Sequence, residues 1–210
     1  MQRPGDLIRQ SAILMLFLTS SIEPSVAQVQ REKGEWKEGK REGFWEFFYP
    51  DGKIMAQENY KNGQLHGPAH AFSPEGKLVQ RENWINDLQE DSAWYFHSNG
   101  QLHRKGIYRH GSYEGLWLTF FPNGRLEQSG TYFNGTPEGK FINWFENGER
   151  KEEGEYRNGL RDGQFVFYHE RRKGKISILG QYCKNEPCGI WVWYNRRGKP
   201  RYSATAPTEP

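Results

Sequence analysis

The stretch Asn123–Phe141 reads NGRLEQSGTYFNGTPEGKF, and 24 residues later Asn147–Phe165 reads NGERKEEGEYRNGLRDGQF. The glycines, the Asn-Gly pairs and the aromatic residues recur in register, whereas the side chains between them change freely. Self-similarity at a fixed period is the sequence signature of a repeat architecture. This segment therefore predicts a protein built from stacked copies of one small unit.

Nearly every glycine of the chain follows this period. Four columns hold 23 of the 24 glycines, and only Gly5 lies outside them. Within the first column the spacing is 24 residues five times and then 26, because the segment YHERRKG carries two extra residues. The first column comprises Gly43, Gly67, Asp91, Gly115, Gly139, Gly163 and Gly189.

Three aromatic columns accompany the glycines and contain 19 of the 32 aromatic residues. Rings at such a spacing indicate that each unit buries its rings against its neighbours. The first column is Trp45, Trp117, Phe141, Phe165 and Trp191, interrupted by Ala69 and Ala93; the second is Phe48, Phe72, Phe96, Phe120, Trp144, Tyr168 and Tyr194; the third is Trp36, Tyr60, Trp84, Tyr108, Tyr132, Tyr156 and Tyr182.

Each unit contains two turns. The segments PDGK, PNGR and ENGE are compact turns between residues of β character, which is a strong hairpin signal. The other connection, as in FNGTPEG and RNGLRDG, is longer and has glycine at both ends. Asp87 and Asn185 replace a turn glycine there, and these residue types tolerate the left-handed backbone conformation best after glycine. Each unit is thus expected to form two short strands.

The pattern predicts an all-β fold. We expect about seven stacked β-hairpin repeats over residues 34–202, forming an elongated, open antiparallel meander that is single-layered or shallowly curled. Rings of the first and second columns are three residues apart, so a regular strand would place them on opposite faces. Either both faces carry rings or a β-bulge intervenes.

The repeat unit resembles the MORN repeat, specifically its 24-residue bacterial variant. The pattern G-x-(W/F)-x-x-(F/Y)-x-x-(N/D/E)-G-x-L, followed by G-x-Y-x-x-G-x-x-x-G, carries the resemblance from Gly34 to about Tyr202. Bacterial proteins of this kind are often labelled antitoxin-like. The second and third repeats depart from the pattern, since Ala69, Ala93 and Asp91 replace a ring or a glycine. The resemblance implies a scaffold that contacts membranes or partner proteins, and it implies no catalytic residues.

The first 27 residues have the features of an export signal. MQRPGDLIRQ carries two arginines, SAILMLFLTS is apolar, and Ser25 and Ala27 occupy the −3 and −1 positions of a cleavage site before Gln28. The apolar run is about half of the ~20 residues that a membrane-spanning helix needs, and it lacks the polar alternation of an amphipathic helix. We predict a signal peptide over residues 1–27, a short linker over 28–33 and a disordered tail over 203–210. The mature chain would then lie in the periplasm, outside the cell or on its surface, without a transmembrane span.

Cys183 and Cys188 enclose four residues in the final repeat. In an oxidising compartment this spacing favours a local disulfide. Redox catalysis is the alternative, but the motif is not C-x-x-C and no helix follows it. A structural disulfide is therefore the preferred interpretation.

Charge and motifs argue against several function classes. The formal net charge is +3, and basic and acidic residues are interspersed rather than gathered in the basic stripe of a nucleic-acid-binding protein. The chain has no Ser/His/Asp signature, phosphate-binding loop or metal-ligand spacing. We therefore expect no nucleic-acid partner, no cofactor, no metal site and no enzymatic activity.

One irregularity is a candidate binding site. Five of the six histidines lie in repeats two and three, the units in which Ala69 and Ala93 replace rings. One interpretation is a dent in the aromatic face that accepts a ligand, a glycan or a partner's side chain; the alternative is local drift, with Trp94 and Tyr95 filling the space. His97 and His103 flank the SNGQ turn and are expected to face each other across a hairpin. The candidate patch comprises Trp45, Ala69, Ala93, Trp94, Trp117, His97 and His103.

These observations favour an exported, non-enzymatic repeat scaffold that binds a protein or a component of the cell envelope. Glycan binding on aromatic platforms is one alternative, which exposed tryptophans in a row would favour. Neutralisation of a partner toxin is another, and it requires that the target be exported too. Membrane contact is compatible with each of these readings.

Overall fold

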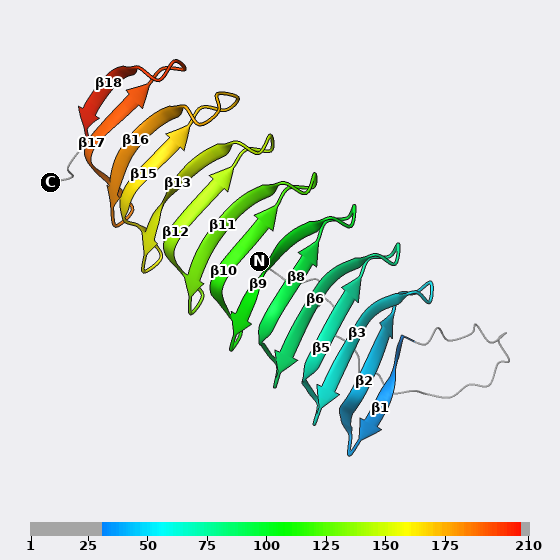
Figure 1. Ribbon diagram of the computed structural model, residues 1–210. Helices are drawn as coiled ribbons and strands as arrows, with labels where there is room; N and C mark the ends of the chain where they lie inside the picture. The colour runs from blue at the N-terminus through cyan, green and yellow to red at the C-terminus, as the bar shows by residue number, and fades with distance from the viewer. Residues whose placement is uncertain (1–30, 207–210) are drawn as a thin grey trace, which may run out of the picture.

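A computed structural model describes residues 31–206, and these residues form a single β-sheet with no helix among them (Figure 1). The strand segments are β1 Glu32–Lys37, β2 Lys40–Phe48, β3 Ile54–Lys61, β4 Gln64–Leu65, β5 Gly67–Phe72, β6 Leu78–Ile85, β7 Leu88–Gln89, β8 Asp91–Phe96, β9 Leu102–Arg109, β10 Ser112–Phe120, β11 Leu126–Phe133, β12 Thr136–Trp144, β13 Arg150–Arg157, β14 Leu160–Arg161, β15 Gly163–Tyr168, β16 Ile176–Cys183, β17 Glu186–Tyr194 and β18 Pro200–Thr205.

The sheet is an open antiparallel meander. Each strand pairs with its neighbours in the chain, and the two-residue segments β4, β7 and β14 are the first parts of strands that continue as β5, β8 and β15. Within the described residues β1 pairs only with β2, and β18 pairs only with β17, so the sheet does not close. The predicted fold class is confirmed.

The first glycine column marks a bend in each repeat. Gly115 has a φ of 66°, and the pairing of β9 with β10 shifts register between Glu114 and Leu118. A positive φ of this size is costly for most residues. Asp91, the one substitute in the column, adopts the same φ of 66°, in keeping with the tolerance of Asp for this conformation.

A β-bulge accompanies the second aromatic column. Thr119 pairs with Gln128 and Phe120 pairs with Leu126, so that Glu127 is the extra residue on β11. The same irregularity precedes the second-column ring in all seven hairpins. The bulge thus lies on the strand that follows each second-column ring, and no extra residue separates the first-column and second-column rings on their own strand.

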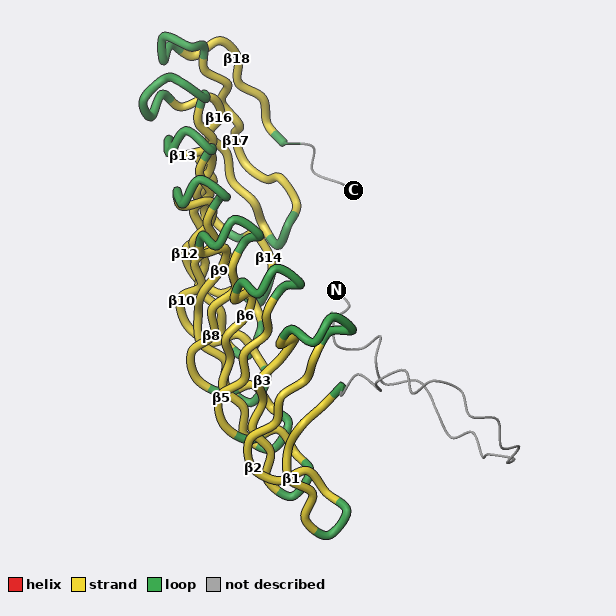
Figure 2. The backbone as a smooth tube through the Cα atoms, turned by 90° about the vertical axis from the view of Figure 1, so that its right-hand side faces the viewer, coloured by secondary structure: helices red, strands yellow, loops and turns green. Residues whose placement is uncertain are grey.

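The first-column rings form the interior of the sheet. Each is at most 8% exposed, although the sheet is one layer thick. Such burial requires the strands to curve around the rings, and the sheet is indeed bent into a crescent (Figure 2). We call the face that carries these rings the ring face; it comprises Trp45, Trp117, Phe141, Phe165, Trp191 and the residues of the same strands that share their side.

The rings fit because the preceding strand offers glycine beneath them. A Cβ atom on Gly130 would lie 2.1 Å from Cε1 of Phe141, and one on Gly106 would lie 2.2 Å from Cδ2 of Trp117. Both distances are far inside van der Waals contact. The third glycine column, which comprises Gly34, Gly106, Gly130, Gly154 and Gly180, therefore lets a ring lie directly on the backbone.

The strand boundaries differ from the predicted domain limits at both ends. β1 begins at Glu32, inside the predicted linker, and β18 continues to Thr205. Residues 203–205 are accordingly paired with β17 instead of belonging to a disordered tail. The predicted signal peptide, residues 1–27, lies outside the described residues.

Candidate binding face

The second and third repeats exchange a glycine and a ring for a glutamate and an alanine. Glu58 and Glu82 occupy the third glycine column, and the rings that would lie on them are replaced by Ala69 and Ala93. A glutamate side chain and an aromatic ring cannot share this space, so the two changes occur together. Sequence reasoning missed this pairing, although the gaps in the glycine column were a usable signal.

The carboxylate of Glu82 is inside the protein. It is 2% exposed, and its Oε1 accepts hydrogen bonds from the Tyr95 hydroxyl and from Nε2 of Gln89, the latter at 2.9 Å. The Tyr95 hydroxyl also lies 2.9 Å from that of Tyr108. Burial, followed by the negative charge of Glu82, raises the pKa of Tyr95 far above its ordinary value. Tyr95 therefore stays protonated and acts as a hydrogen-bond donor.

A second row of residues on the ring face runs beside the first-column rings. On a strand that carries a ring it lies two residues after the ring, as Thr119 follows Trp117, and on the next strand it lies two residues before the glycine, as Gln128 precedes Gly130. Cross-strand pairing connects its members directly, so the row crosses the sheet at right angles to the strands. Its two ends are apolar, with Phe47 and Phe167 among their members. The central part, which we call the polar row, comprises Gln80, Tyr95, Arg104, Thr119, Gln128, Asn143 and Glu152.

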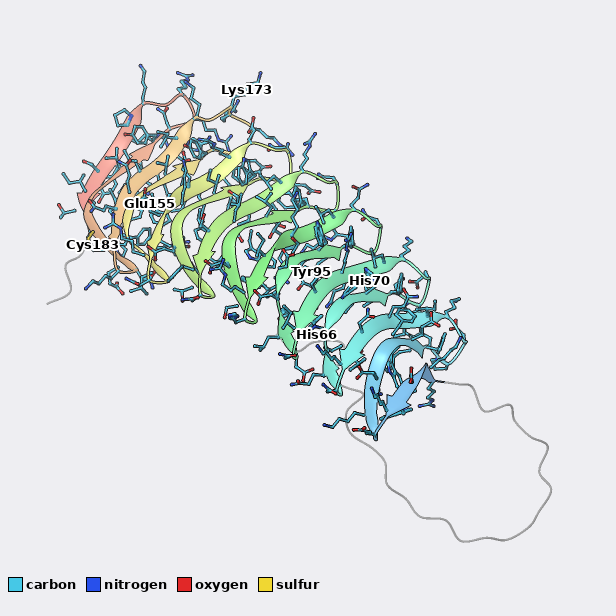
Figure 3. The ribbon with its side chains drawn as sticks, turned by 60° about the horizontal axis from the view of Figure 1, so that its bottom comes forward. His66, His70, Tyr95, Glu155, Lys173 and Cys183 are labelled. Carbon is cyan, nitrogen blue, oxygen red and sulfur yellow. A yellow bond between two sulfur atoms is a disulfide. The ribbon has the colours of Figure 1, made fainter. Side chains whose placement is uncertain are left out.

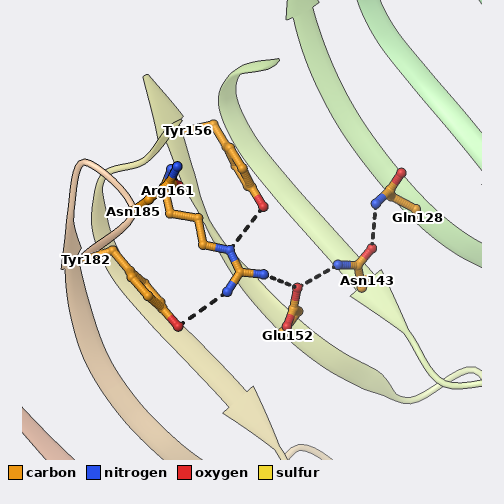
Figure 4. A network of polar contacts seen from close by, with 7 residues as sticks. All are labelled: Gln128, Asn143, Glu152, Tyr156, Arg161, Tyr182 and Asn185. Carbon is orange, nitrogen blue, oxygen red and sulfur yellow. Dashed lines mark hydrogen bonds and ion pairs between the residues drawn. The ribbon is translucent and has the colours of Figure 1, made fainter. Parts of the chain in front are cut away.

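Hydrogen bonds link the C-terminal part of the polar row (Figure 4). Gln128 Nε2 donates to Asn143 Oδ1 at 2.9 Å, and Asn143 Nδ2 donates to Glu152 Oε1 at 2.8 Å. Glu152 also lies 3.6 Å from the guanidinium of Arg161, which donates to the hydroxyl of Tyr182 at 3.3 Å. These contacts hold a series of donors and acceptors in fixed positions along the sheet.

Arginines stack on the rings at three places. The guanidinium carbon of Arg41 lies 4.8 Å from the ring centroid of Trp45, that of Arg104 lies 4.5 Å from Tyr95, and that of Arg161 lies 5.2 Å from Phe165. A cation over an aromatic face is attracted by the ring's quadrupole. The ring face therefore carries fixed charges of both signs among its aromatic residues.

A family model for the MORN repeat variant matches residues 41–62, 113–134 and 137–158. The chain carries MORN repeats. The matched segments fall on β2–β3, β10–β11 and β12–β13. Their ring columns are intact, and their glycine columns are intact except at Glu58 in β3. No curated protein matches the chain.

MORN repeats suggest a repeat scaffold for contacts with proteins or membranes. In the part of the chain that the structure describes, no helix is long and apolar enough to cross a membrane. The same residues contain no group of three or more His, Cys, Asp or Glu side chains arranged to hold a metal ion.

The structure distributes the predicted patch over different surroundings. Trp45, Ala93 and Trp117 are at most 3% exposed and belong to the packed interior of the MORN repeats. Trp94 follows Ala93 in β8 and so projects from the opposite face, where Arg81 stacks on its ring at 4.7 Å. The patch is thus not a single rimmed surface. Tyr95, whose hydroxyl bonds Glu82, packs against Ala93 and fills the space at that position.

Ala69 has different neighbours. The residue two positions on is Ala71 in place of a tyrosine, and a cavity of about 60 Å³ remains beside them. A cavity thus lies beside Ala69, whereas Tyr95 packs against Ala93.

His97 and His103 do face each other across their hairpin. Their ring centroids are 4.4 Å apart, and Nε2 of His97 lies 2.8 Å from the carbonyl oxygen of Phe120 in the next repeat. Burial, and then the neighbouring His97, lower the pKa of His103. The pair connects two repeats near the turn and lies apart from the cavity at Ala69, whose lining it does not join.

Cys183 and Cys188 form the predicted disulfide, which joins β16 to β17 beside the turn between them. Cys183 lies at the long edge of the sheet near its C-terminal end, on the same edge as His66, whereas Lys173 lies on the opposite edge (Figure 3). The disulfide therefore fastens the last MORN repeats at one edge and does not approach the polar row.

Proposed function

We propose that the protein is an exported, non-enzymatic MORN-repeat scaffold that binds an extended segment of a partner protein or envelope component on its ring face. The observation that carries the proposal is the polar row. Its seven side chains are directly paired across consecutive strands, and all of them are polar: only Arg104 is basic and only Glu152 is acidic. A face that served stability alone would favour apolar residues here, as in the flanking positions Phe47 and Phe167.

The geometry suits a linear partner. Neighbouring strands are roughly 4.8 Å apart, so the polar row offers one donor or acceptor at each such interval along the crescent. An extended chain lying along the row would meet these groups in succession, with the stacked arginines beside it. The affinity would come from several modest hydrogen bonds added along one rigid surface.

Glycan binding on tryptophan platforms is disfavoured by the burial of the rings. Trp45, Trp84, Trp117 and Trp191 are between 1% and 8% exposed. A ring buried to this extent cannot stack on a sugar. We therefore retain the protein or envelope partner as the proposal.

Site-specific photo-crosslinking in the producing cell tests both the surface and the compartment. A photoreactive side chain replaces Gln128 on the ring face or, as the matched control, Ser129, the next residue of β11, which projects from the other face. We expect a crosslinked partner from position 128 and none from position 129, together with a mature N-terminus at Gln28. Equal crosslinking from both positions would contradict the ring face as the binding surface, and a retained N-terminal segment would contradict the cleavage.

A further inference from the structure

The cavity beside Ala69 is lined mainly by groups that suit a cation. Its lining comprises Glu58, Leu65, Ala69, His70, Ala71, Gln80, Glu82 and Trp84. Two carboxylates, an amide and an indole surround a volume of about 60 Å³. This space exists because Glu58 takes the place of a glycine and Ala69 takes the place of the ring that would cover it.

One oxygen of Glu82, a residue that lines this cavity, has no hydrogen-bond donor. Both donors to Glu82, Tyr95 and Gln89, bind its Oε1, and Oε2 is buried with no partner among the described residues. An unsatisfied buried charged oxygen is strongly unfavourable. If Oε2 were protonated, its O–H would in turn need an acceptor, so in either form Glu82 has hydrogen-bonding capacity that the described residues do not use.

The surrounding charges leave this site negative. Neither Glu58 nor Glu82 forms a salt bridge within the described part of the chain. Three arginines lie near the cavity, and each has another partner: Arg41 lies 2.6 Å from Glu32, Arg104 is stacked on Tyr95, and Arg81, which is paired with His70, is stacked on Trp94. The Tyr60 hydroxyl donates to Glu58 and, like Tyr95, supplies a neutral hydrogen bond without neutralising charge.

We propose that this cavity binds an organic cation, namely the ammonium or guanidinium group of a small molecule or of a Lys or Arg side chain. Glu82 Oε2 accepts a hydrogen bond from the cation, Glu58 supplies a second negative charge, and Trp84 adds an aromatic wall of the kind that attracts cations. The proposal goes beyond the scaffold function and does not depend on it, because a free cation can fill the cavity without any partner protein.

Calorimetric titration of the full mature chain with methylguanidinium and n-butylammonium tests the proposal. N-methylurea serves as the neutral counterpart of methylguanidinium, and calcium chloride tests for a metal site instead. We expect saturable binding of at least one organic cation at one site per chain and none of N-methylurea. No saturable binding of either organic cation, or binding of calcium alone, would overturn the proposal.

Variants locate the binding. Ala69→Leu fills the cavity without changing charge, and Glu82→Gln removes the charge at nearly constant shape; each is expected to weaken cation binding at least tenfold. Glu127→Gln, a carboxylate on the bulge of β11 outside the cavity, is the matched control and is expected to bind as the parent does. Circular dichroism and melting curves check each fold, and Glu58→Gln replaces any variant that does not fold. Parent-like affinity in folded Ala69→Leu and Glu82→Gln proteins would refute the site.

A capped Gly-Arg-Gly peptide separates the two sources of the cation. Tighter binding of the peptide than of methylguanidinium indicates the side chain of a partner, whereas exclusion of the peptide with retained methylguanidinium binding indicates a small molecule. If position 128 gives no crosslinked partner while the titration still shows cation binding, the scaffold proposal is wrong and the cation site is retained.

Discussion

At the scale of single residues, the fold depends on a ring lying directly on a glycine of the preceding strand. The same contact recurs at Gly34, Gly106, Gly130, Gly154 and Gly180, each of which would bring a Cβ atom within 2.4 Å of a ring atom. Where glycine becomes Glu82, the ring becomes Ala93. The ring and its glycine are therefore one structural unit that changes as a pair.

Replacing Gly130 by alanine tests this coupling. Overpacking of this kind costs about 1–3 kcal/mol, and loss of a buried ring in Phe141→Ala costs about 3–5 kcal/mol. In the double variant Gly130→Ala, Phe141→Ala the added methyl group no longer meets a ring. We therefore expect the double variant to lose about as much stability as Phe141→Ala alone. Chemical denaturation measures all four free energies of unfolding. Ser129→Ala, on the other face of β11, is the control and should change stability by less than about 0.5 kcal/mol; strictly additive effects of the pair would contradict the coupling.

His103 should make stability depend on pH. Burial and the adjacent His97 hold its pKa below the ordinary value of 6.5. Protonation thus favours the unfolded state, and the stability that the neutral imidazole contributes is present above about pH 6.5 and is lost as the pH falls toward the lowered pKa. We expect His103→Gln to flatten the melting temperature between pH 7 and pH 5, with a remainder from His70, whose pKa burial also lowers. An unchanged slope in His103→Gln would refute the assignment.

At the scale of elements, glutamates fasten four of the hairpins to the one that follows. Glu42 accepts a hydrogen bond from the backbone N–H of Asn62 at 2.7 Å, and Glu138 accepts one from that of Asn158 at 2.7 Å. Both donors lie in turns with positive φ. A side chain of one repeat therefore supports the turn of the following repeat, so the turns along this edge are joined by more than the strand ladder.

The disulfide should stabilise only the C-terminal hairpin. Closing the short loop between Cys183 and Cys188 contributes about 2 kcal/mol in the chain-entropy account. We expect the Cys183→Ser, Cys188→Ser double variant to exchange the amide protons of β16–β18 faster, by a factor of about 30, while β2–β6 keep their rates. Hydrogen exchange measured segment by segment provides the test. Faster exchange along the entire sheet would show that the disulfide has a global role instead.

The sequence predicted the elements well because the repeat imposes them. Asn-Gly turns, glycine periodicity and ring spacing are local signals, and the pairing of His97 with His103 followed from their places on either side of one turn. The polar row gave no such signal, since Gln80, Arg104 and Asn143 share no residue type. It becomes visible only when the register aligns the strands, and the bulges that set this register depend on the packed rings. The cavity likewise needs side-chain positions, because Ala69 and Ala93 look alike in sequence and differ only in their neighbours.

At the scale of the whole molecule, stability should be nearly one-dimensional. Pairing in the described residues connects only strands that are neighbours along the chain, and the ring contacts follow the same order, as in Tyr156–Phe165 and Phe165–Tyr182. In such a structure each repeat is held by the repeats on either side of it. A local defect should therefore be felt by its neighbours and fade beyond them.

Phe165→Ala provides the decisive measurement. The ring is 1% exposed and contacts Tyr156 and Tyr182, so its removal should cost about 3–5 kcal/mol. We expect hydrogen exchange to accelerate in β13–β17 and to remain unchanged in β2–β6, and the unfolding curve to broaden as the two ends separate in stability. Trp45→Ala should give the mirror image, with acceleration at β1–β3 and none at β15–β17. Uniform acceleration by either variant would mean that the sheet unfolds as one cooperative unit, and the nearest-neighbour description of the molecule would then be wrong.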